Sequence, residues 1–471
     1  MKRITIEPVS RIEGHAKVTI QLNDAGQVEN AELHVTQVRG FEKLTEGRAF
    51  YEMPGITARI CGICPISHLL ASAKACDAIM AVRIPPAARK LRELIHYAQF
   101  VQSHALSFFY LSSPDLILGM DAYPGTRNVM GIIASHPEIA RDGIELRKFG
   151  LQIIETLGQE RVHSSWIVPG GVKTPMTAAM RDKILLELPK AKQIAERTLA
   201  FFKSISDQFK DDIAKFGCFP SMYLGLVNAK GDLQLYEGNL RFRGANDEIV
   251  SDQIAPEDYA DWIGEATLRN SYLKAPFYKP DGVDGMYRVG PLARLNAADR
   301  CGTPRADAEL NDFRRHYGKP AHSAFLYHEA RLIEIVYALE KIETLLADPR
   351  LTEDHVRANA SVNSLEGVGI IEAPRGVLIH HYKVNNEGAI IWANLIVATG
   401  HNNLGMGKSV KQVATEYVHG DKIEEGMLNR VSAVIRAYDP CLSCSTHADG
   451  TIAVRIQLLA TDGELLDEVA N

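Results

Sequence analysis

The chain has 471 residues, with 52 basic and 58 acidic side chains and a formal net charge of −6. Apolar residues make up 46% and charged residues 23% of the sequence, the composition of a globular protein with a large core. The slight acidity argues against nucleic acid or an anionic membrane as the main partner.

The N-terminus and the cysteines narrow the class of protein. No apolar run approaches the roughly 18 residues that a membrane-spanning helix needs. The first residues, MKRITIEPVS, lack the apolar core of a secretory signal, so we expect a cytoplasmic location. Seven cysteines do not form a disulfide framework, which leaves metal or redox chemistry for any cysteines that cluster.

The first 40 residues are expected to form antiparallel strands. Apolar and polar residues alternate over 4–6 and 16–22, and the sequence Asn-Asp-Ala-Gly at 23–26 supplies a turn. Helical periodicity then dominates, with apolar residues every three or four positions over 91–109, 194–213 and 332–345. Three long amphipathic helices imply a bundle, so we predict an α+β, mainly α fold with a long-helix core and small peripheral β-sheets.

Two segments interrupt this pattern. The stretch 218–320 is richer in Gly, Pro and Asp, and we interpret it as an irregular insertion with short strands, not as a second domain. Near the C-terminus, alternation over 452–458 followed by Asp-Gly at 462–463 predicts a terminal hairpin.

Four of the seven cysteines form two pairs of identical spacing. Cys61 and Cys64 lie in RICGICPISH, and Cys441 and Cys444 lie in DPCLSCSTH. Two residues between thiolates let one local turn present both sulfurs to a metal, so two such turns predict a four-sulfur site. Pro65 suits the first position of a helix and places Cys64 at a helix N-terminus, which favours the metal-binding thiolate.

Two interpretations of this site remain open from spacing alone. A pair of CxxC motifs is typical of structural zinc, but zinc ribbons separate their pairs by roughly 15–20 residues. Here the gap between Cys64 and Cys441 is 377 residues in a chain with a large core, which favours a metal retained for its reactivity. His68 would lie over the same face as Cys64 as a hydrogen-bond donor, although a histidine at this spacing is more often structural.

The paired motifs carry a family resemblance. RICGICPISH, DPCLSCSTH and PVSRIEGH in the first strands resemble the large, catalytic subunit of nickel–iron hydrogenases, and the resemblance covers essentially the whole chain. Segments 39–43, 102–109 and 438–441 are most similar to the cytoplasmic, bidirectional, NAD-reducing type. The resemblance implies the nickel–iron hydrogenase large-subunit fold and reversible, heterolytic cleavage of dihydrogen.

The resemblance also implies the metal centre. All four paired cysteines would ligate nickel, and Cys64 and Cys444 would also bridge to an iron carrying carbon monoxide and cyanide. Soft thiolate donors suit nickel in changing oxidation states.

An arginine of the family corresponds to Arg375. In the sequence Ala-Pro-Arg-Gly, the resemblance places Arg375, after Pro374, above the open position of the metals, where Asp115 and Asp439 would hold it by charge-assisted hydrogen bonds. Without the resemblance, Arg375 is an arginine in a turn and Asp439, before Pro440, is a turn residue or helix cap.

Further residues match family positions. Glu13 matches the proton-relay carboxylate, although by itself it would be taken for a surface strand residue. Thr399 matches a position that hydrogen-bonds a cyanide. Glu42, His447 and the backbone carbonyl of Leu395 match a second site for magnesium or iron.

The tail and the electron route follow from the same resemblance. Residues 1–447 would form a single catalytic domain, and 448–471 would be a propeptide that a maturation endopeptidase removes after His447; an ordinary hairpin completing a sheet is the alternative. Three scattered cysteines cannot hold an iron–sulfur cluster with four protein ligands. We therefore expect, as partner, an iron–sulfur small subunit, with a flavin-containing diaphorase added in the NAD-reducing type.

Three other functions compete with the enzyme. A non-enzymatic relative in the quinone module of respiratory complex I would lack the paired cysteines. A dihydrogen-sensing regulatory subunit would usually lack the C-terminal extension. A structural zinc protein remains the alternative outside the family.

Overall fold

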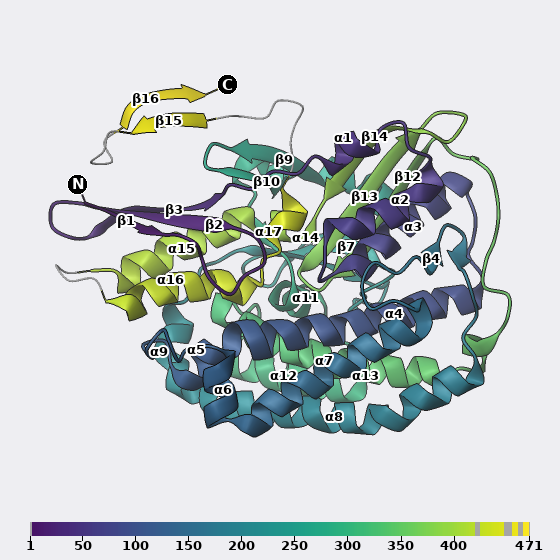
Figure 1. Ribbon diagram of the computed structural model, residues 1–471, viewed down its shortest axis with the longest axis horizontal. Coiled ribbons are helices and arrows are strands. Elements are labelled where there is room, and N and C mark those ends of the chain that lie inside the picture. The colour runs from purple at the N-terminus through teal and green to yellow at the C-terminus, as the bar shows by residue number, and fades with distance from the viewer. Residues whose placement is uncertain (1, 420–423, 447–454, 460–464, 471) are drawn as a thin grey trace.

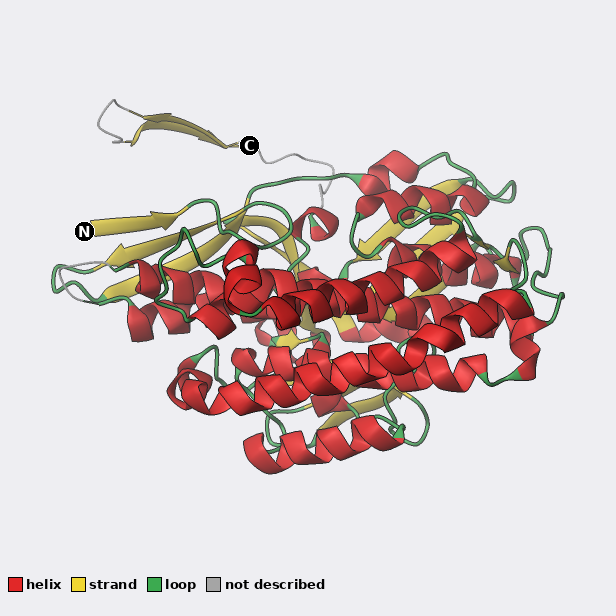
Figure 2. Ribbon diagram, turned by 60° about the horizontal axis from the view of Figure 1, so that its bottom comes forward, coloured by secondary structure: helices red, strands yellow, loops and turns green. Residues whose placement is uncertain are grey.

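Among the described residues, the fold combines a bundle of long helices with three sheets and two small two-stranded ribbons. A computed structural model describes residues 2–419, 424–446, 455–459 and 465–470. The long helices line one side of the molecule, and the N-terminal sheet and a second sheet lie on the other (Figure 1). A view from a second direction keeps the same division, with helices in front and most strands behind or above them (Figure 2).

Four helices build the bundle: α4 (Pro86–Ala105), α7 (Pro137–Gly158), α8 (Ala178–Ser206) and α13 (Tyr327–Leu346). Helix α4 packs against α7 and α13, and α8 packs against the same two helices. Proline opens α4 and α7, and Thr177 caps α8 by accepting a hydrogen bond from the Met180 amide. The bundle core and the mainly α composition are therefore confirmed.

Two of the three predicted helical segments are not a single α-helix. The segment 91–109 continues from α4 through a π-helical turn, Leu106–Ser112, into α5 (Ser113–Leu118). The segment 194–213 is not one helix, because a short 3-10 turn (Asp207–Phe209) separates α8 from α9 (Lys210–Lys215). The apolar residues keep their spacing across this turn because Phe209 is still packed in the core. Its ring centroid lies 5.1 Å from that of Phe325.

The N-terminal sheet confirms the predicted antiparallel strands. It contains β1 (Lys2–Ile6), β2 (Ala16–Leu22) and β3 (Val28–Val35), extended by β10 (Ser271–Tyr278) and β9 (Ile263–Leu268). Asn23 closes the predicted turn, with its Oδ1 accepting hydrogen bonds from the Ala25 and Gln27 amides. Strand β10 runs parallel to β3, so a distant segment completes the sheet.

The segment 218–320 is more regular than its composition indicates. A four-stranded sheet contains β6 (Met222–Val227), β7 (Asn239–Arg243), β8 (Ile249–Ile254) and β11 (Tyr287–Arg288), and helices α11 (Pro291–Ala297) and α12 (Pro304–Tyr317) follow it. The short strands that were predicted for this segment are present. Short strands joined by turns explain why its composition resembles that of a loop.

A third sheet, which the sequence did not reveal, lies against the cysteine-bearing helix. It consists of β12 (Glu366–Ala373), β13 (Gly376–Val384) and β14 (Ile390–Ile396), and α3 (Pro65–Met80) packs on it. Gly367 and Gly369 permit this contact, because added Cβ atoms would lie 2.2 and 2.0 Å from carbonyl oxygens of α3. A two-residue turn, Pro374-Arg375, joins β12 to β13.

Two further helices, α15 (Asn403–Tyr417) and α16 (Glu425–Tyr438), have 15 and 14 residues. The remaining elements are short helices or small ribbons: α1 (Phe41–Thr45), α2 (Met53–Thr57), α6 (Val129–Ser135), α10 (Tyr259–Trp262), α14 (Ala398–His401), α17 (Leu442–Ser445), β4 (Ile167–Val168), β5 (Gly171–Val172), β15 (Arg455–Leu459) and β16 (Leu465–Ala470). Strands β15 and β16 pair antiparallel and form the predicted terminal hairpin. Within the described ranges, no helix has both the length and the apolar character needed to cross a bilayer.

Glu329 on α13 makes the stability of this bundle depend on pH. Its side chain is buried, and burial raises its pKa from 4.5 to about 7. The hydroxyl of Tyr317 and the charges of Lys203, Asp312 and His316 act on it from neighbouring helices. The folded chain therefore keeps this proton up to a higher pH than the unfolded chain does. As a result, the free energy of unfolding falls as the pH rises from 4.5 to 7, by up to about 3 kcal/mol.

We expect Glu329→Gln to remove this dependence. The amide does not titrate, so the stability of the variant relative to the unsubstituted chain should be greater at pH 8 than at pH 5. Urea unfolding of the metal-free chain at both pH values measures the difference. A difference that is the same at both pH values would contradict the assignment of the titration to Glu329.

Candidate metal centre

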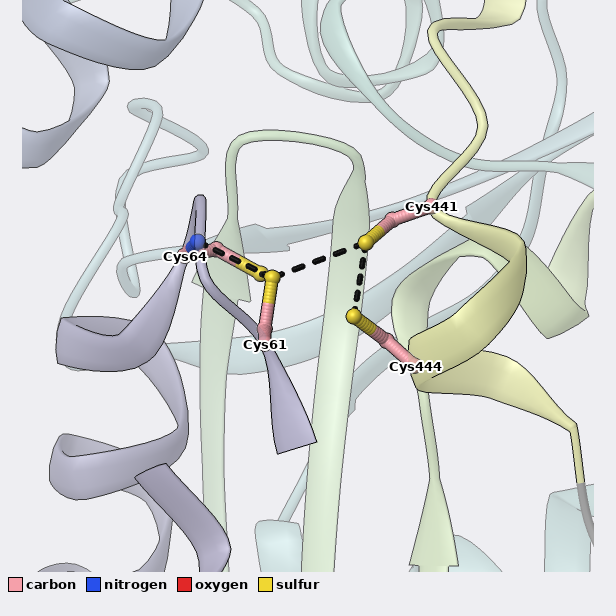
Figure 3. A group of neighbouring side chains, drawn as sticks. All are labelled: Cys61, Cys64, Cys441 and Cys444. Atoms are coloured by element: carbon pink, nitrogen blue, oxygen red, sulfur yellow. Dashed lines mark hydrogen bonds between the residues drawn. The ribbon is translucent and has the colours of Figure 1, made fainter. Parts of the chain in front are cut away.

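The two cysteine pairs meet in the interior. The Sγ atoms of Cys61, Cys64, Cys441 and Cys444 all lie within 4.8 Å of one another, and all four residues are buried. Figure 3 shows the pairs entering from opposite sides with their sulfurs pointing toward one another. Sγ of Cys61 lies 2.9 Å from that of Cys64 and 3.5 Å from that of Cys441, which confirms the predicted four-sulfur cluster.

Local backbone structure presents the first pair. Cys61 follows a 3-10 turn (Ala58–Ile60), and Cys64 is the residue before helix α3, which Pro65 opens as predicted. The amides of Ile63 and Cys64 point at Sγ of Cys61, at 3.3 and 3.0 Å. These donors stabilise negative charge on that sulfur.

The second pair is held by contacts far away in sequence. The backbone of Cys441 forms a parallel β-bridge with Glu13, and the Leu442 amide donates to the Glu13 carbonyl at 3.2 Å. The Cys441 amide donates to Oγ1 of Thr399 at 3.0 Å. Thr446 forms an antiparallel bridge with Leu273 of β10. The segment 441–446 is therefore buried between the N-terminal segment and β10.

The sulfurs differ in electrostatic environment. Burial raises the pKa of the Cys441 and Cys444 thiols. Hydrogen bonds from Cys441, Cys444 and Cys61 lower the pKa of Cys64. Four crowded, buried sulfurs need compensating positive charge to ionise together, which a bound metal cation supplies.

Arg375 lies beside the sulfurs at the tip of the β12–β13 hairpin. Its Nε donates to the Asp439 carbonyl at 2.5 Å and its Nη2 donates to Oδ1 of Asp439 at 3.0 Å. Nη1 lies 3.5 Å from Oγ of Ser103. Burial opposes the charge, but the carboxylate of Asp439 and the cysteine sulfurs raise the pKa of Arg375 well above its usual value.

Asp115 pairs with a different set of arginines. Its carboxylate contacts Arg11 at 2.5 Å and Arg436 at 3.2 Å, and Oδ1 accepts a hydrogen bond from Asn429 at 3.1 Å. The described contacts join Arg375 to Asp439 and Ser103 and do not include Asp115. The expectation that both aspartates hold Arg375 is therefore corrected for Asp115, because Asp115 lies on α5, where these other cations surround it.

A small cavity of about 10 Å³ adjoins the sulfurs. Among the residues that line it are Cys64, His68, Pro374, Arg375, Thr399, Cys441 and Cys444. His68 is fully buried, and its Nδ1 lies 3.1 Å from Nε2 of His380. His68 lies close enough to Cys64 to lower the pKa of that thiol, and its Nε2 makes no other hydrogen bond to the described residues.

Glu13 lies at the edge of the centre. Its Oε2 accepts a hydrogen bond from the Ser443 amide at 3.1 Å, and its side chain is half-buried. The residue is thus not the freely exposed strand glutamate that its sequence context alone suggested.

The second predicted site is only partly described. Glu42 lies on α1, which packs on β14, the strand that carries Leu395. His447 lies outside the described residues, as does the start of the tail that follows it.

Several residues at the centre escaped sequence reasoning. Ser103 contacts Arg375, Arg294 contacts the turn that carries Arg375, and His380 contacts His68. All three lie on elements distant in sequence from their partners. Glu372, which binds Arg294, was also missed. The sequence could have pointed to it, because it directly precedes the Ala-Pro-Arg-Gly motif. A lone buried polar residue in an apolar helix or strand shows no pattern of its own.

Two family models match the chain. A model described as HoxL-like matches residues 3–38, and one described as nickel-dependent hydrogenase matches residues 39–126 and 242–447. The chain belongs to the nickel-dependent hydrogenase family. It is a hydrogenase large subunit, and the paired cysteines that a complex I relative would lack form one buried group of four sulfur donors.

Individual relatives agree with the family. The chain is 42% identical to one subunit of the vhc F420-non-reducing hydrogenase of Methanococcus voltae, over 96% of each chain. It is 39% identical to the NAD-reducing hydrogenase HoxS subunit beta of Cupriavidus necator, over 100% of this chain and 99% of the relative. The crystal structure of an NAD+-reducing NiFe hydrogenase in the H2-reduced state matches with a TM-score of 0.92 at 44% identity, covering 95% and 100% of the two chains.

Gly14 tests whether docking of the C-terminal pair builds the hydrogenase centre. Its φ is +85°, and an added Cβ would lie 2.8 Å from Cβ of Leu442 and 2.9 Å from the Ser443 nitrogen. We expect Gly14→Ala to displace this segment and lower the nickel bound per chain roughly tenfold, as measured by metal analysis of the purified complex.

Gly47 provides the matched control. Its φ is +80°, but an added Cβ would meet no atom within 4 Å. Gly47→Ala therefore carries a similar backbone strain without touching the cysteine segment, and we expect it to keep its nickel. Equal loss of nickel in both variants would attribute the effect to strain and not to docking.

Proposed function

We propose that the four sulfurs hold a nickel–iron centre whose iron carries carbon monoxide and cyanide, with Cys64 and Cys444 shared between the metals. When bound, this centre supplies the reversible heterolytic cleavage of dihydrogen. The observation that carries the proposal is the buried cluster of four sulfurs opening on a cavity with Arg375. Four soft donors within 4.8 Å fit nickel.

The residues around the cavity have separate tasks in this proposal. Arg375 keeps a fixed positive charge over the cavity, because Asp439 accepts two hydrogen bonds from its guanidinium, one at Nε and one at Nη2. It orients and polarises dihydrogen and contacts a cyanide. Thr399 and Pro374 line the cavity and would contact a cyanide on the iron, and Thr399 also accepts a hydrogen bond from the Cys441 amide. His68 lines the same cavity beside Cys64.

Glu13 carries the proton away from the centre in this proposal. Its carboxylate sits against the Ser443 amide on the segment that bears Cys441 and Cys444, and its half-buried position links the interior with the surface. A carboxyl group beside thiolates is suited to accept and release protons. Asp115 supports this region indirectly, by binding Arg436 and Arg11 beside the same segment.

Electrons leave through partner subunits. Four cysteines belong to the centre, and the other three, Cys76, Cys218 and Cys301, lie in no group of potential metal ligands among the described residues. We infer an iron–sulfur small subunit, together with a flavin-containing diaphorase that reduces NAD in the cytoplasm, because the chain resembles the NAD-reducing relatives over its whole length. The chain then acts as the hydrogen-activating subunit of a hydrogen:NAD+ oxidoreductase.

A second metal and a processing step complete the proposal. Glu42, the Leu395 carbonyl and His447 bind magnesium or iron(II). A maturation endopeptidase removes residues 448–471 after His447, which leaves 1–447 as the catalytic domain. Two observations support removal: β15 and β16 form a sheet that joins no other described strand, and the chain is buried up to Thr446.

Metal analysis with infrared spectroscopy tests the centre. We expect nickel and iron in the purified complex, with metal-bound carbon monoxide and cyanide stretches, and we expect Cys64→Ser to abolish these bands. The isolated chain should not reduce NAD with dihydrogen, because it has no clusters to carry electrons. Zinc in place of nickel, or NAD reduction by the chain alone, would refute the proposal.

Mass spectrometry tests the processing step. We expect the active complex to contain a chain ending at His447, and a metal-free precursor to retain residues 448–471. A precursor in which His447 and Ala448 are replaced should keep the tail and contain less active enzyme. Full activity from protein that retains the tail would contradict the step and favour the ordinary hairpin.

A further inference from the structure

The turn that carries Arg375 is enclosed from both sides. Ala373 pairs with Gly376, so Pro374 and Arg375 alone form the hairpin turn. Gly376 has φ +137°, and an added Cβ would lie 2.2 Å from Cγ2 of Val289. Arg375 therefore depends on backbone placement within this turn, and not only on its own side-chain contacts.

Arg294 of α11 binds the backbone of this turn. Its Nη1 donates to the Ala373 carbonyl and its Nη2 donates to the Pro374 carbonyl, each at 2.9 Å. The side chain is fully buried and lies over the ring of Phe100, with 5.2 Å between its Cζ and the ring centroid. The two carbonyls belong to the residues directly before Arg375.

The other three N–H groups of Arg294 bind carboxylates. Nε and Nη2 donate to the two oxygens of Glu334 at 2.6 and 2.7 Å, and Nη1 donates to Glu372 at 2.8 Å. All five guanidinium donors thus have an acceptor, so the group has one orientation. Glu334 also contacts Nε2 of His104, and Glu372 accepts from the Leu226 amide at 3.0 Å.

This arrangement ties three elements to one turn. Arg294 lies on α11, Glu334 on the central helix α13 and Glu372 on β12. Although burial opposes its charge, Glu334 and Glu372 raise the pKa of Arg294, which keeps it a cation. A fixed cation with two carboxylates can hold two carbonyl oxygens without competition from water.

We propose that Arg294 is a positioning residue for Arg375: it fixes the Pro374-Arg375 turn through the two carbonyls, with Glu334 and Glu372 fixing Arg294. The proposal rests on the role of Arg375 in the proposed function. Lysine cannot replace Arg294, because one ammonium group has three donors and cannot reach two carboxylates and two carbonyls.

A buried ion pair could instead serve stability alone, and Arg92 offers the matched control. Arg92 is also fully buried, donates to Asp77 at 2.6 Å and binds the carbonyls of Gly171 and Val168 at 3.1 and 2.7 Å. Those carbonyls belong to the small β4–β5 ribbon and not to the Arg375 turn. Arg92→Lys therefore reproduces the loss of a buried arginine elsewhere.

Hydrogen–deuterium exchange of the metal-free full chain is the first measurement. We expect Arg294→Lys to speed exchange of the amides at 375–378 about tenfold relative to Arg92→Lys, because the turn loses charge-assisted bonds. Glu372→Gln, which keeps the shape of the side chain, should give a smaller increase if Arg294→Lys does not fold. Equal exchange of this segment in the two lysine variants would overturn the proposal.

Infrared spectra of the loaded complex provide the second measurement. We expect Arg294→Lys, and not Arg92→Lys, to shift the cyanide bands and to lower kcat with little change in the KM for dihydrogen. Unshifted bands with unchanged kcat would overturn the positioning role. The two measurements also separate this proposal from the proposed function. If the unsubstituted complex shows no cyanide bands but Arg294→Lys still speeds exchange of the turn, the proposed function is refuted, and the role of Arg294 in holding the turn is not.

Discussion

The centre depends on one long-range contact, the docking of the segment that carries Cys441 and Cys444 onto the N-terminal residues. Cys61 and Cys441 are 380 positions apart, but the entropy cost of closing a loop grows only slowly with its length. The main requirement is therefore a preformed binding surface on the N-terminal residues. Glu13 supplies backbone and side-chain acceptors for this segment, and Gly14 leaves room for Leu442.

Positive side chains close to the cysteines stabilise the negative charge of the buried thiolates. Four thiolates in the interior would be unstable without positive charge close by. Arg375, in the β12–β13 turn, lies at the sulfurs. Arg331 of α13 donates to the Ala437 carbonyl of α16, and Arg436 of α16 pairs with Asp115. Arg331 and Arg436 thus hold the chain that leads to the second cysteine pair, and Arg375 offsets the charge of the ligands.

Sequence reasoning found the centre because its chemistry requires a repeated local pattern. The two CxxC pairs and the helical periodicity of α4 and α13 are short-range signals, and the structure confirms both. Strands β12 and β13 gave no such signal, since strands buried on both faces lack alternation. Asp115 was placed with Arg375 by family position, and only tertiary packing decides which arginine a buried carboxylate meets.

Asp439 has both of the roles that the sequence allowed, because it ends a helix and also binds Arg375. It follows α16 in the left-handed conformation, with φ 53° and ψ 53°, and Pro440 prevents the helix from continuing. This reversal sends Cys441 back toward Cys61. The same backbone carbonyl and the carboxylate beside it bind Arg375. The cap that ends the helix is therefore also what holds the arginine, so a change at this position alters the path of the metal ligands and the charge over the cavity together.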